Sequence, residues 1–364
     1  MTQETGKTAL ITGASSGIGL ELTKLFVRDG YNVVLVARPD DKLEQLKQQF
    51  PGTDGQRIMI IGKDLSQEDV AQELYDEVKA TGLTVNVLVN DAGVSTYGKF
   101  ATETNWDREK EIIHLNVLTT TLLTKLYLKD MVARNEGRIL QLASLVSVTP
   151  FPLMSVYAAT KAYILNFTES MRDELKDTNV TMTALMPNAT ATNFFREAGA
   201  PPLNVEDMMD DPAMVAKDGY DALMKGEAKV VAGGATNKVQ EVLSRISPIE
   251  TLGPMMRKLL SPKDEAERQQ ARNVVIGVGI AAVVIAGIAV LASGPKNRTP
   301  DLDLVGPVDK LKYRYKAGKL KAKAKDLLDD AEDEFDDAKE VVEDKWAGVK
   351  KIAGRVIADV LTQR

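Results

Sequence analysis

Tyr157 and Lys161 are four residues apart in a stretch with a helical pattern, Ser155 to Asp177. This spacing puts the phenol and the ammonium on one face of the helix. A free tyrosine has a pKa of about 10, and a neighbouring ammonium lowers it by stabilising the phenolate. The pair therefore predicts proton transfer, although the same spacing also occurs between ordinary surface neighbours.

Ser144 is a second candidate for chemistry, because it follows a strand-like run that ends at Leu142. A hydroxyl group at the carboxyl end of a strand can stabilise charge that develops on a substrate oxygen. Ser147 is a less well-spaced substitute, and capping of a loop is the alternative role for either serine. The chain has one histidine, His114, and no cysteine, which excludes thiol catalysis, disulfides and cysteine or histidine-rich metal sites.

A glycine-rich turn follows the first strand-like run, Lys7 to Thr12, and opens a helix. Glycines at a helix N-terminus let backbone N–H groups approach a pyrophosphate. The turn predicts a dinucleotide site, although its Thr-Gly-x-x-x-Gly-x-Gly spacing differs from the G-x-G-x-x-G fingerprint. Its predicted cofactor-binding residues are Gly13, Ser15, Ser16, Gly17, Ile18 and Gly19.

Arg38 ends the second strand-like run, Asn32 to Ala37. A guanidinium can bind a ribose 2′-phosphate with two hydrogen bonds, whereas an NAD enzyme usually has a carboxylate near this position. Arg38 therefore favours NADP(H), with a solvated surface arginine as the alternative. Asp40 and Asp41 follow and are predicted to cap the next helix.

In their order and spacing, these motifs resemble the short-chain dehydrogenase/reductase family over about Lys7 to Val231. Ser144 precedes Tyr157 by thirteen residues, the family's separation. The resemblance implies that Asn116 completes a group with Ser144, Tyr157 and Lys161, bends its long helix and holds a water linked to Lys161. Lys161 would also bond the nicotinamide ribose.

The resemblance also implies further cofactor contacts. Asp64 would bond the adenine amino group, or alternatively cap the next helix. Asp91 stands where the family commonly has asparagine, and Asn188 replaces a glycine and is expected to tolerate positive φ. The remaining implied cofactor residues are Asn90, Ala92, Gly93, Pro187 and Thr192.

Alternating strand-like and helical runs predict an α/β fold, a Rossmann-like, doubly wound parallel sheet with ligands at the carboxyl ends of the strands. The strand-like runs are rich in valine, isoleucine and leucine without polar alternation, as is typical of strands buried on both faces. The other expected strands are Arg57–Ile61, Val85–Asn90, Gly137–Leu142 and Val180–Leu185; the expected helices are Gly17–Asp29, Asp41–Phe50, Gln67–Thr81, Asn105–Arg134 and Ser155–Asp177.

Composition divides the chain into an NADP-binding catalytic domain, a charged linker, a predicted transmembrane helix and a charged amphipathic helical tail: 1–262, 263–273, 274–293 and 294–364. Residues 274–293 carry no charge, and twenty helical residues span about 30 Å, one hydrocarbon core. We expect membrane association with the catalytic domain in the cytoplasm. The net charge of −6 gives no electrostatic case for nucleic-acid binding.

The predicted function is an NADP(H)-dependent oxidoreductase that transfers a hydride between the nicotinamide and a carbonyl or alcohol substrate, with Tyr157 as general acid and base. Asn193–Met224 is expected to form a lid with an apolar wall, which would suit an apolar or lipid-like substrate. Homo-oligomers are common in the family. The alternative is a membrane-anchored NADP-binding scaffold or interaction protein that acts through its C-terminal tail.

Overall fold

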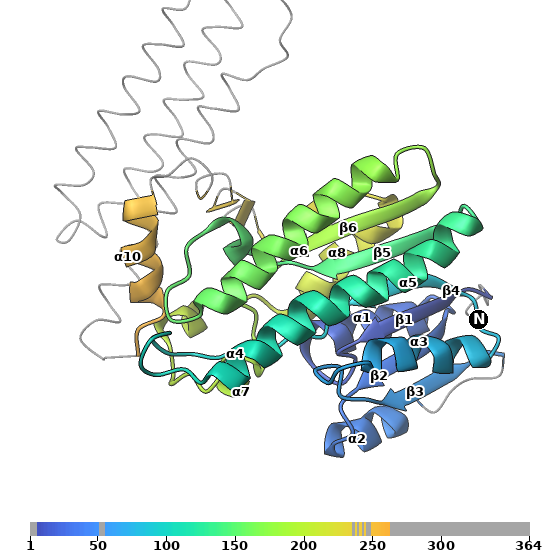
Figure 1. Cartoon of the computed structure of the whole chain (residues 1–364), viewed down its shortest axis with the longest axis horizontal. Helices are drawn as coiled ribbons and strands as arrows, with labels where there is room; N and C mark the ends of the chain where they lie inside the picture. The colour runs from blue at the N-terminus through green and yellow to red at the C-terminus, as the bar shows by residue number, and fades with distance from the viewer. Residues whose placement is uncertain are drawn as a thin grey trace, which may run out of the picture. The chain divides into compact units, whose positions relative to one another are not determined.

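The computed structural model describes residues 6–50, 55–234 and 249–262, with 237–238, 240–241 and 244 between the last two ranges. Within them, seven parallel strands form one sheet in the order β3-β2-β1-β4-β5-β6-β7 (Figure 1). The strand order reverses between β1 and β4, so the ligand crevice of such a sheet is expected at their carboxyl ends. The strands are β1 (Thr8–Thr12), β2 (Asn32–Ala37), β3 (Ile58–Gly62), β4 (Val85–Asn90), β5 (Gly137–Leu142), β6 (Val180–Met186) and β7 (Lys229–Val231).

The predicted strands form because their apolar side chains are covered on both faces. All five residues of β1 are buried, as are five of the six residues of β4. β2, β4 and β5 begin and end where the sequence predicts, and β1, β3 and β6 differ by single residues at their ends. The sequence does not predict β7, because three residues carry too short a pattern.

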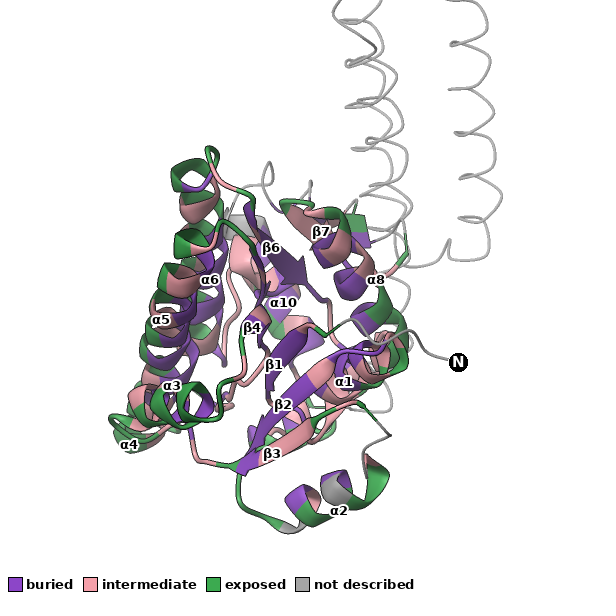
Figure 2. Cartoon of the chain, turned by 90° about the vertical axis from the view of Figure 1, so that its right-hand side faces the viewer, coloured by how far each residue is buried: buried purple, intermediate pink, exposed green. Residues whose placement is uncertain are grey.

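Helices cover both faces of the sheet (Figure 2). On one face, Leu22 and Phe26 of α1 join Tyr220 and Leu223 of α8 in one apolar core. On the other face, α3 and α5 meet the sheet through a second core. The doubly wound prediction is therefore confirmed. The helices are α1 (Gly17–Arg28), α2 (Asp41–Gln49), α3 (Val70–Ala80), α4 (Trp106–Ile113), α5 (Thr120–Ala133), α6 (Ser155–Glu174), α7 (Phe194–Glu197), α8 (Pro212–Lys225) and α10 (Ile249–Leu259).

The long helix expected over Asn105–Arg134 is not one regular helix. A π-helical turn, His114–Thr119, separates α4 from α5. Three polar side chains hold this turn: Thr119 donates to the Leu65 carbonyl at 2.8 Å, Thr120 donates to the Leu115 carbonyl at 3.2 Å, and Asn116 bonds the backbone of Val94. The helix is therefore irregular around Asn116, where the family resemblance implies a bend, and contacts with Leu65 and Val94 hold the irregular turn.

The second part of the predicted lid, Asn193–Met224, belongs to a helix that packs on the sheet. Phe194 and Phe195 join an apolar cluster beside Tyr157, but Pro212–Lys225 is helix α8, which packs against α1. Met214 of this helix is 39% exposed. The methionine and alanine residues of 212–224 therefore lie on a helix that covers the sheet.

The membrane prediction concerns residues outside the described ones. No helix within the described part of the chain combines the length and the apolar character needed to cross a bilayer. The linker 263–273, the segment 274–293 and the tail 294–364 lie outside the described residues and stay predictions.

Candidate active site

The β1–α1 turn brings the predicted glycines against two other loops. Gly13 and Gly17 have positive φ, +72° and +56°, which glycine adopts without strain. A Cβ atom on Gly17 would lie 3.0 Å from Cγ2 of Thr192, so the turn lies directly against the loop after β6. Ser15 and Ser16 follow in the turn, and Ile18 packs against the core below α1.

The end of β4 is fixed to the neighbouring strands. The side chain of Asn90 donates to Thr124 Oγ1 at 3.0 Å and to Gln141 Oε1 at 3.2 Å. The hydroxyl of Thr12 accepts the backbone N–H groups of Asp91 and Ala92, both at 3.1 Å. The side chain of Asn90 is therefore buried and connects β4 to β5 and α5.

Asp91, rather than a neutral residue, packs against the glycine turn. Its Oδ2 atom lies 2.8 Å from where a Cβ on Gly13 would stand and 2.5 Å from one on Gly19. The carboxylate accepts the backbone N–H of Gly19. Glycine is required at both positions because any larger residue would collide with this carboxylate.

Tyr157 and Lys161 of α6 lie together at the carboxyl end of β5. The Nζ atom of Lys161 is 5.7 Å from the centre of the Tyr157 ring and donates to the Leu142 carbonyl at 2.6 Å. It also lies 3.6 Å from where a Cβ on Gly93 would stand, so the loop after β4 closes over it. The structure thus brings the predicted proton-transfer pair to the edge of the sheet where the glycine turn ends.

Ser144 belongs to the same group. Its hydroxyl donates to the Pro187 carbonyl at 3.3 Å, and its side chain bonds Tyr157 closely enough to lower the pKa of that phenol. Ser147 proves to be a positioning residue. Its Oγ accepts the N–H of Ser144 at 3.2 Å and donates to the Lys161 carbonyl at 2.9 Å. Sequence spacing does not reveal this bridge, which exists only once β5 and α6 are packed.

Burial decides the protonation of Tyr157 and Lys161. Burial raises the pKa of Tyr157 well above its ordinary value, and the charge of Asp91 raises it further. Burial lowers the pKa of Lys161 to about 8, opposed by the charge of Asp91. Among the protein's own groups, withdrawal of the Tyr157 phenol from water therefore outweighs the hydrogen bond that lowers its pKa.

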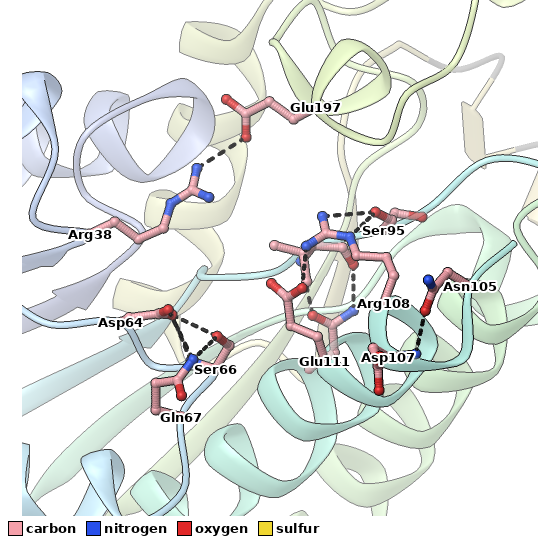
Figure 3. A network of polar contacts seen from close by, with 12 residues as sticks. Arg38, Asp64, Ser66, Gln67, Ser95, Asn105, Asp107, Arg108, Glu111 and Glu197 are labelled. Carbon is pink, nitrogen blue, oxygen red and sulfur yellow. Dashed lines mark hydrogen bonds and ion pairs between the residues drawn. The ribbon is translucent and has the colours of Figure 1, made fainter.

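Asn116 holds the loop after β4. Its Oδ1 accepts the N–H of Val94 at 3.0 Å, and its Nδ2 donates to the Val94 carbonyl at 3.0 Å and to Thr160 Oγ1 at 3.1 Å. Arg108 of α4 holds the next residue of the same loop, with Nη2 3.0 Å from the Ser95 carbonyl (Figure 3). The side chain of Asn116 thus links the loop to α6, one residue before Lys161.

Arg38 and Asp64 lie at the ends of β2 and β3 (Figure 3). Arg38 is exposed and forms an ion pair with Glu197 of α7 at 3.5 Å. Asp64 accepts from the N–H of Ser66 at 3.0 Å and from its hydroxyl at 2.7 Å, well before α3 begins at Val70. Burial raises the pKa of Asp64, but the bonds from Ser66 and Gln67 and the charge of Arg38 outweigh it, so the pKa is lowered.

The structure tests the expectations for Asp40, before α2, and for Asn188, after β6. Asp40 caps α2 as predicted, accepting the N–H of Lys42 at 3.1 Å. Asn188 does not adopt the positive φ expected of a glycine replacement. Instead, its side chain donates to Asn237 at 3.1 Å, so the turn after β6 is held by a side-chain bond.

The turn after β6 reaches both the glycine turn and Tyr157. The Pro187 carbonyl accepts the N–H of Leu145 at 2.8 Å, and the Thr192 hydroxyl accepts the N–H of Phe194 at 3.3 Å. The Phe194 ring then lies 4.9 Å from the Tyr157 ring, centre to centre. An apolar cluster surrounds this pair, with members that the sequence does not single out: Tyr97, Phe151, Leu153, Met154, Leu203, Val205 and Leu260.

Comparison with known proteins agrees with this geometry. The curated relatives include rat 17-beta-hydroxysteroid dehydrogenase type 3, 33% identical over 197 residues, and bovine very-long-chain 3-oxoacyl-CoA reductase, 31% identical over 194 residues. The matches cover 51% and 52% of this chain and 61% of each relative. The chain therefore spans about three fifths of the length of these relatives.

A solved structure with a similar fold is a short-chain dehydrogenase from Sphingobium yanoikuyae in complex with NADPH. It has a TM-score of 0.57 and 26% identity, and the match covers 62% of this chain and 87% of that one. The model of the short chain dehydrogenase family matches residues 7–202, more than half of the sequence. The chain is a member of the short-chain dehydrogenase family and has that family's oxidoreductase fold.

Proposed function

We propose that this protein is an NADP(H)-dependent oxidoreductase that interconverts a carbonyl group and an alcohol, with Tyr157 as the proton donor and acceptor. The observation that carries the proposal is the convergence of Ser144, Tyr157 and Lys161 at one end of the sheet, beside the glycine turn. A scaffold has no need of this group, so the enzyme is favoured over the scaffold alternative.

The residues at the β1–α1 turn suit a dinucleotide. The side chain of Ser16, the N-cap residue of α1, forms no capping hydrogen bond, so the first N–H groups of this helix can bind an anion. Gly13, Gly17 and Gly19 let the backbone come close, and Arg38 would meet a 2′-phosphate. The remaining proposed contacts are Ser15, Ser16, Asp64, Ala92, Gly93, Pro187, Thr192 and the backbone at Asn90.

The chain's own groups would supply the proton. The bound nicotinamide supplies or accepts the hydride. The raised pKa of Tyr157 keeps the phenol protonated near neutrality, so that it can donate to an oxygen on which negative charge develops. Ser144 donates a hydrogen bond to that oxygen, and the ammonium of Lys161 stabilises the phenolate that remains. Proton donation favours reduction of a carbonyl group.

The substrate we propose is an apolar ketone or 3-oxoacyl compound. Its pocket wall would be Phe194, Phe195 and Leu153, which surround Tyr157 with apolar surface. Two relatives carry names that refer to a 17-beta-hydroxysteroid and to very-long-chain 3-oxoacyl-CoA. A steroid skeleton and a very long acyl chain are both apolar. Membrane attachment through 274–293, with the catalytic domain in the cytoplasm, belongs to the same proposal and would bring the enzyme to lipid-soluble substrates.

The test is a substrate series on the full-length protein, purified in detergent. NADPH oxidation is followed with ketones and 3-oxoacyl thioesters of increasing chain length. The proposal predicts turnover, with kcat/KM rising about threefold or more per added methylene until the pocket is full. Absence of turnover with every carbonyl compound, despite NADPH binding, would contradict it. Separation into membrane and soluble fractions without detergent tests the attachment.

A further inference from the structure

The carboxyl group of Asp91 lies within the turn that joins β1 to α1. A Cβ on Gly13 or Gly19 would stand 2.8 Å or 2.5 Å from its Oδ2 atom. The carboxylate accepts the N–H of Gly19, the third residue of α1. The side chain of Ser16, the N-cap residue, forms no capping hydrogen bond. Asp91, which directly follows β4, therefore acts as the cap of α1.

Few groups are available to compensate the charge of Asp91. The N–H of Gly19 and the ammonium of Lys161 stabilise the charge, while the charge of Asp91 in turn raises the pKa of Tyr157. Burial raises the pKa of Asp91 to about 7, although Lys161 and the Gly19 N–H both oppose the rise. The carboxyl group can therefore gain or lose its proton near neutrality.

The N-terminus of α1 stabilises one negative charge better than two. An N-terminal helix dipole and its free N–H groups stabilise a negative charge, and this effect fades beyond the first turn. The phosphates of a dinucleotide would use the N–H groups of Gly17 and Ile18, while Asp91 already uses that of Gly19. An ionised Asp91 and bound phosphates would repel each other across this turn.

We propose that cofactor binding at this site is coupled to protonation of Asp91, so that the dinucleotide binds more tightly when this carboxyl group is neutral. The inference rests on the proposed function, since it requires that the glycine turn binds a dinucleotide. It makes Asp91 a positioning and charge-sensing residue: it holds Gly19, and its charge opposes the ligand. Affinity then falls as the pH rises through the titration of Asp91.

The test compares the full-length protein with Asp91→Asn, which keeps an oxygen for the Gly19 N–H but carries no charge. NADPH binding is measured by calorimetry at several pH values, in buffers of different ionisation enthalpy. At pH 7.5, we expect the unmodified protein to take up about 0.5 proton more than the variant. At pH 8.5 the variant should bind about five- to tenfold more tightly, and at pH 5.5 the two should be equal.

Two further variants keep the test decisive. Asp107→Asn removes an equal charge from an exposed position in the first turn of α4, and should behave as the unmodified protein does. Asp91→Ser, which is also neutral, repeats the comparison if Asp91→Asn fails to fold. Equal affinities and equal proton uptake at pH 8.5 overturn the inference alone. An unmodified protein that binds no dinucleotide at any pH overturns the proposed function, and the inference with it.

Discussion

The guanidinium of Arg38 and the carboxylate of Glu197 form an ion pair at 3.5 Å that connects the end of β2 to α7 (Figure 3). Lys42 joins the same carboxylate at 2.9 Å. Arg38 and Lys42, which lie near the proposed 2′-phosphate position, thus both pair with the carboxylate of Glu197. A phosphate that binds Arg38 has to compete with Glu197.

This competition predicts that Glu197→Gln strengthens NADPH binding. The pair is exposed, so the gain should be about two- to fivefold, and high salt should remove it. NADH lacks the 2′-phosphate, and its affinity should stay unchanged. Equilibrium fluorescence titrations with both cofactors measure the difference.

Arg38→Gln is the matched control for this prediction. It should weaken NADPH binding about 10- to 100-fold by removing a charge-assisted contact, with little effect on NADH. In the double variant, Glu197→Gln should give no further gain. An unmodified protein that prefers NADH would contradict the role given to Arg38.

The reduction rate should decline as pH rises through the titration of Lys161. Burial lowers the pKa of this ammonium to about 8, so its charge is present below that pH and is lost above it. Lys161→Met should lose activity by about 100-fold or more at pH 7, whereas Lys161→Arg should shift the decline to higher pH. Steady-state pH profiles at saturating NADPH measure both effects. A decline near pH 8 that persists unchanged in Lys161→Arg would assign it to another group.

Folding stability should fall between about pH 4 and pH 7 because of Asp91. An unfolded aspartate has a pKa of about 4, while the folded protein raises it to about 7. Folding therefore takes up a proton in this range, and stability is lost as the pH rises through it. Asp91→Asn should remove this loss. Urea unfolding of both proteins without cofactor at pH 5 and pH 8 tests the prediction, which a pH-independent difference would contradict.

Asn116→Ala should destabilise the loop after β4. The asparagine satisfies both backbone groups of Val94, and the alanine would leave them without these partners. We expect a loss of about 1–3 kcal/mol in the free energy of unfolding. Thr160→Ala removes one partner of the Asn116 amide and should cost less. Urea denaturation ranks the two variants, and an equal or larger loss in Thr160→Ala would argue against the role given to the bonds between Asn116 and Val94.

The sheet was predictable because buried parallel strands have a simple pattern. Residues such as Val33, Leu35 and Val89 are buried, and runs of them mark the strands in any context. The family resemblance implies a bend at Asn116, but periodicity does not reveal the π-helical turn there, because the turn depends on Leu65 and Val94, which are distant in sequence. Propensity and periodicity describe only local structure.

The proposed site follows the same division. Tyr157 and Lys161 could be paired from helical spacing alone, and Ser144 from its place after a strand. The role of Ser147 could not be predicted, because it depends on the packing of β5 against α6. The position of Glu197 beside Arg38 could not be predicted either, because it depends on the fold of the loop after β6. The raised pKa of Tyr157 could not be read from the sequence, since it depends on how deeply the phenol is buried.

The most direct test of the account is the behaviour of Tyr157→Phe, which keeps the ring beside Phe194 but removes the hydroxyl. Single-turnover reduction of a ketone substrate and NADPH affinity are measured on the same preparation. The account predicts a rate at least about 1,000-fold lower, with NADPH bound within about threefold of the unmodified affinity. A variant that binds NADPH and reduces the ketone at close to the unmodified rate would contradict the assignment of Tyr157 as the proton donor.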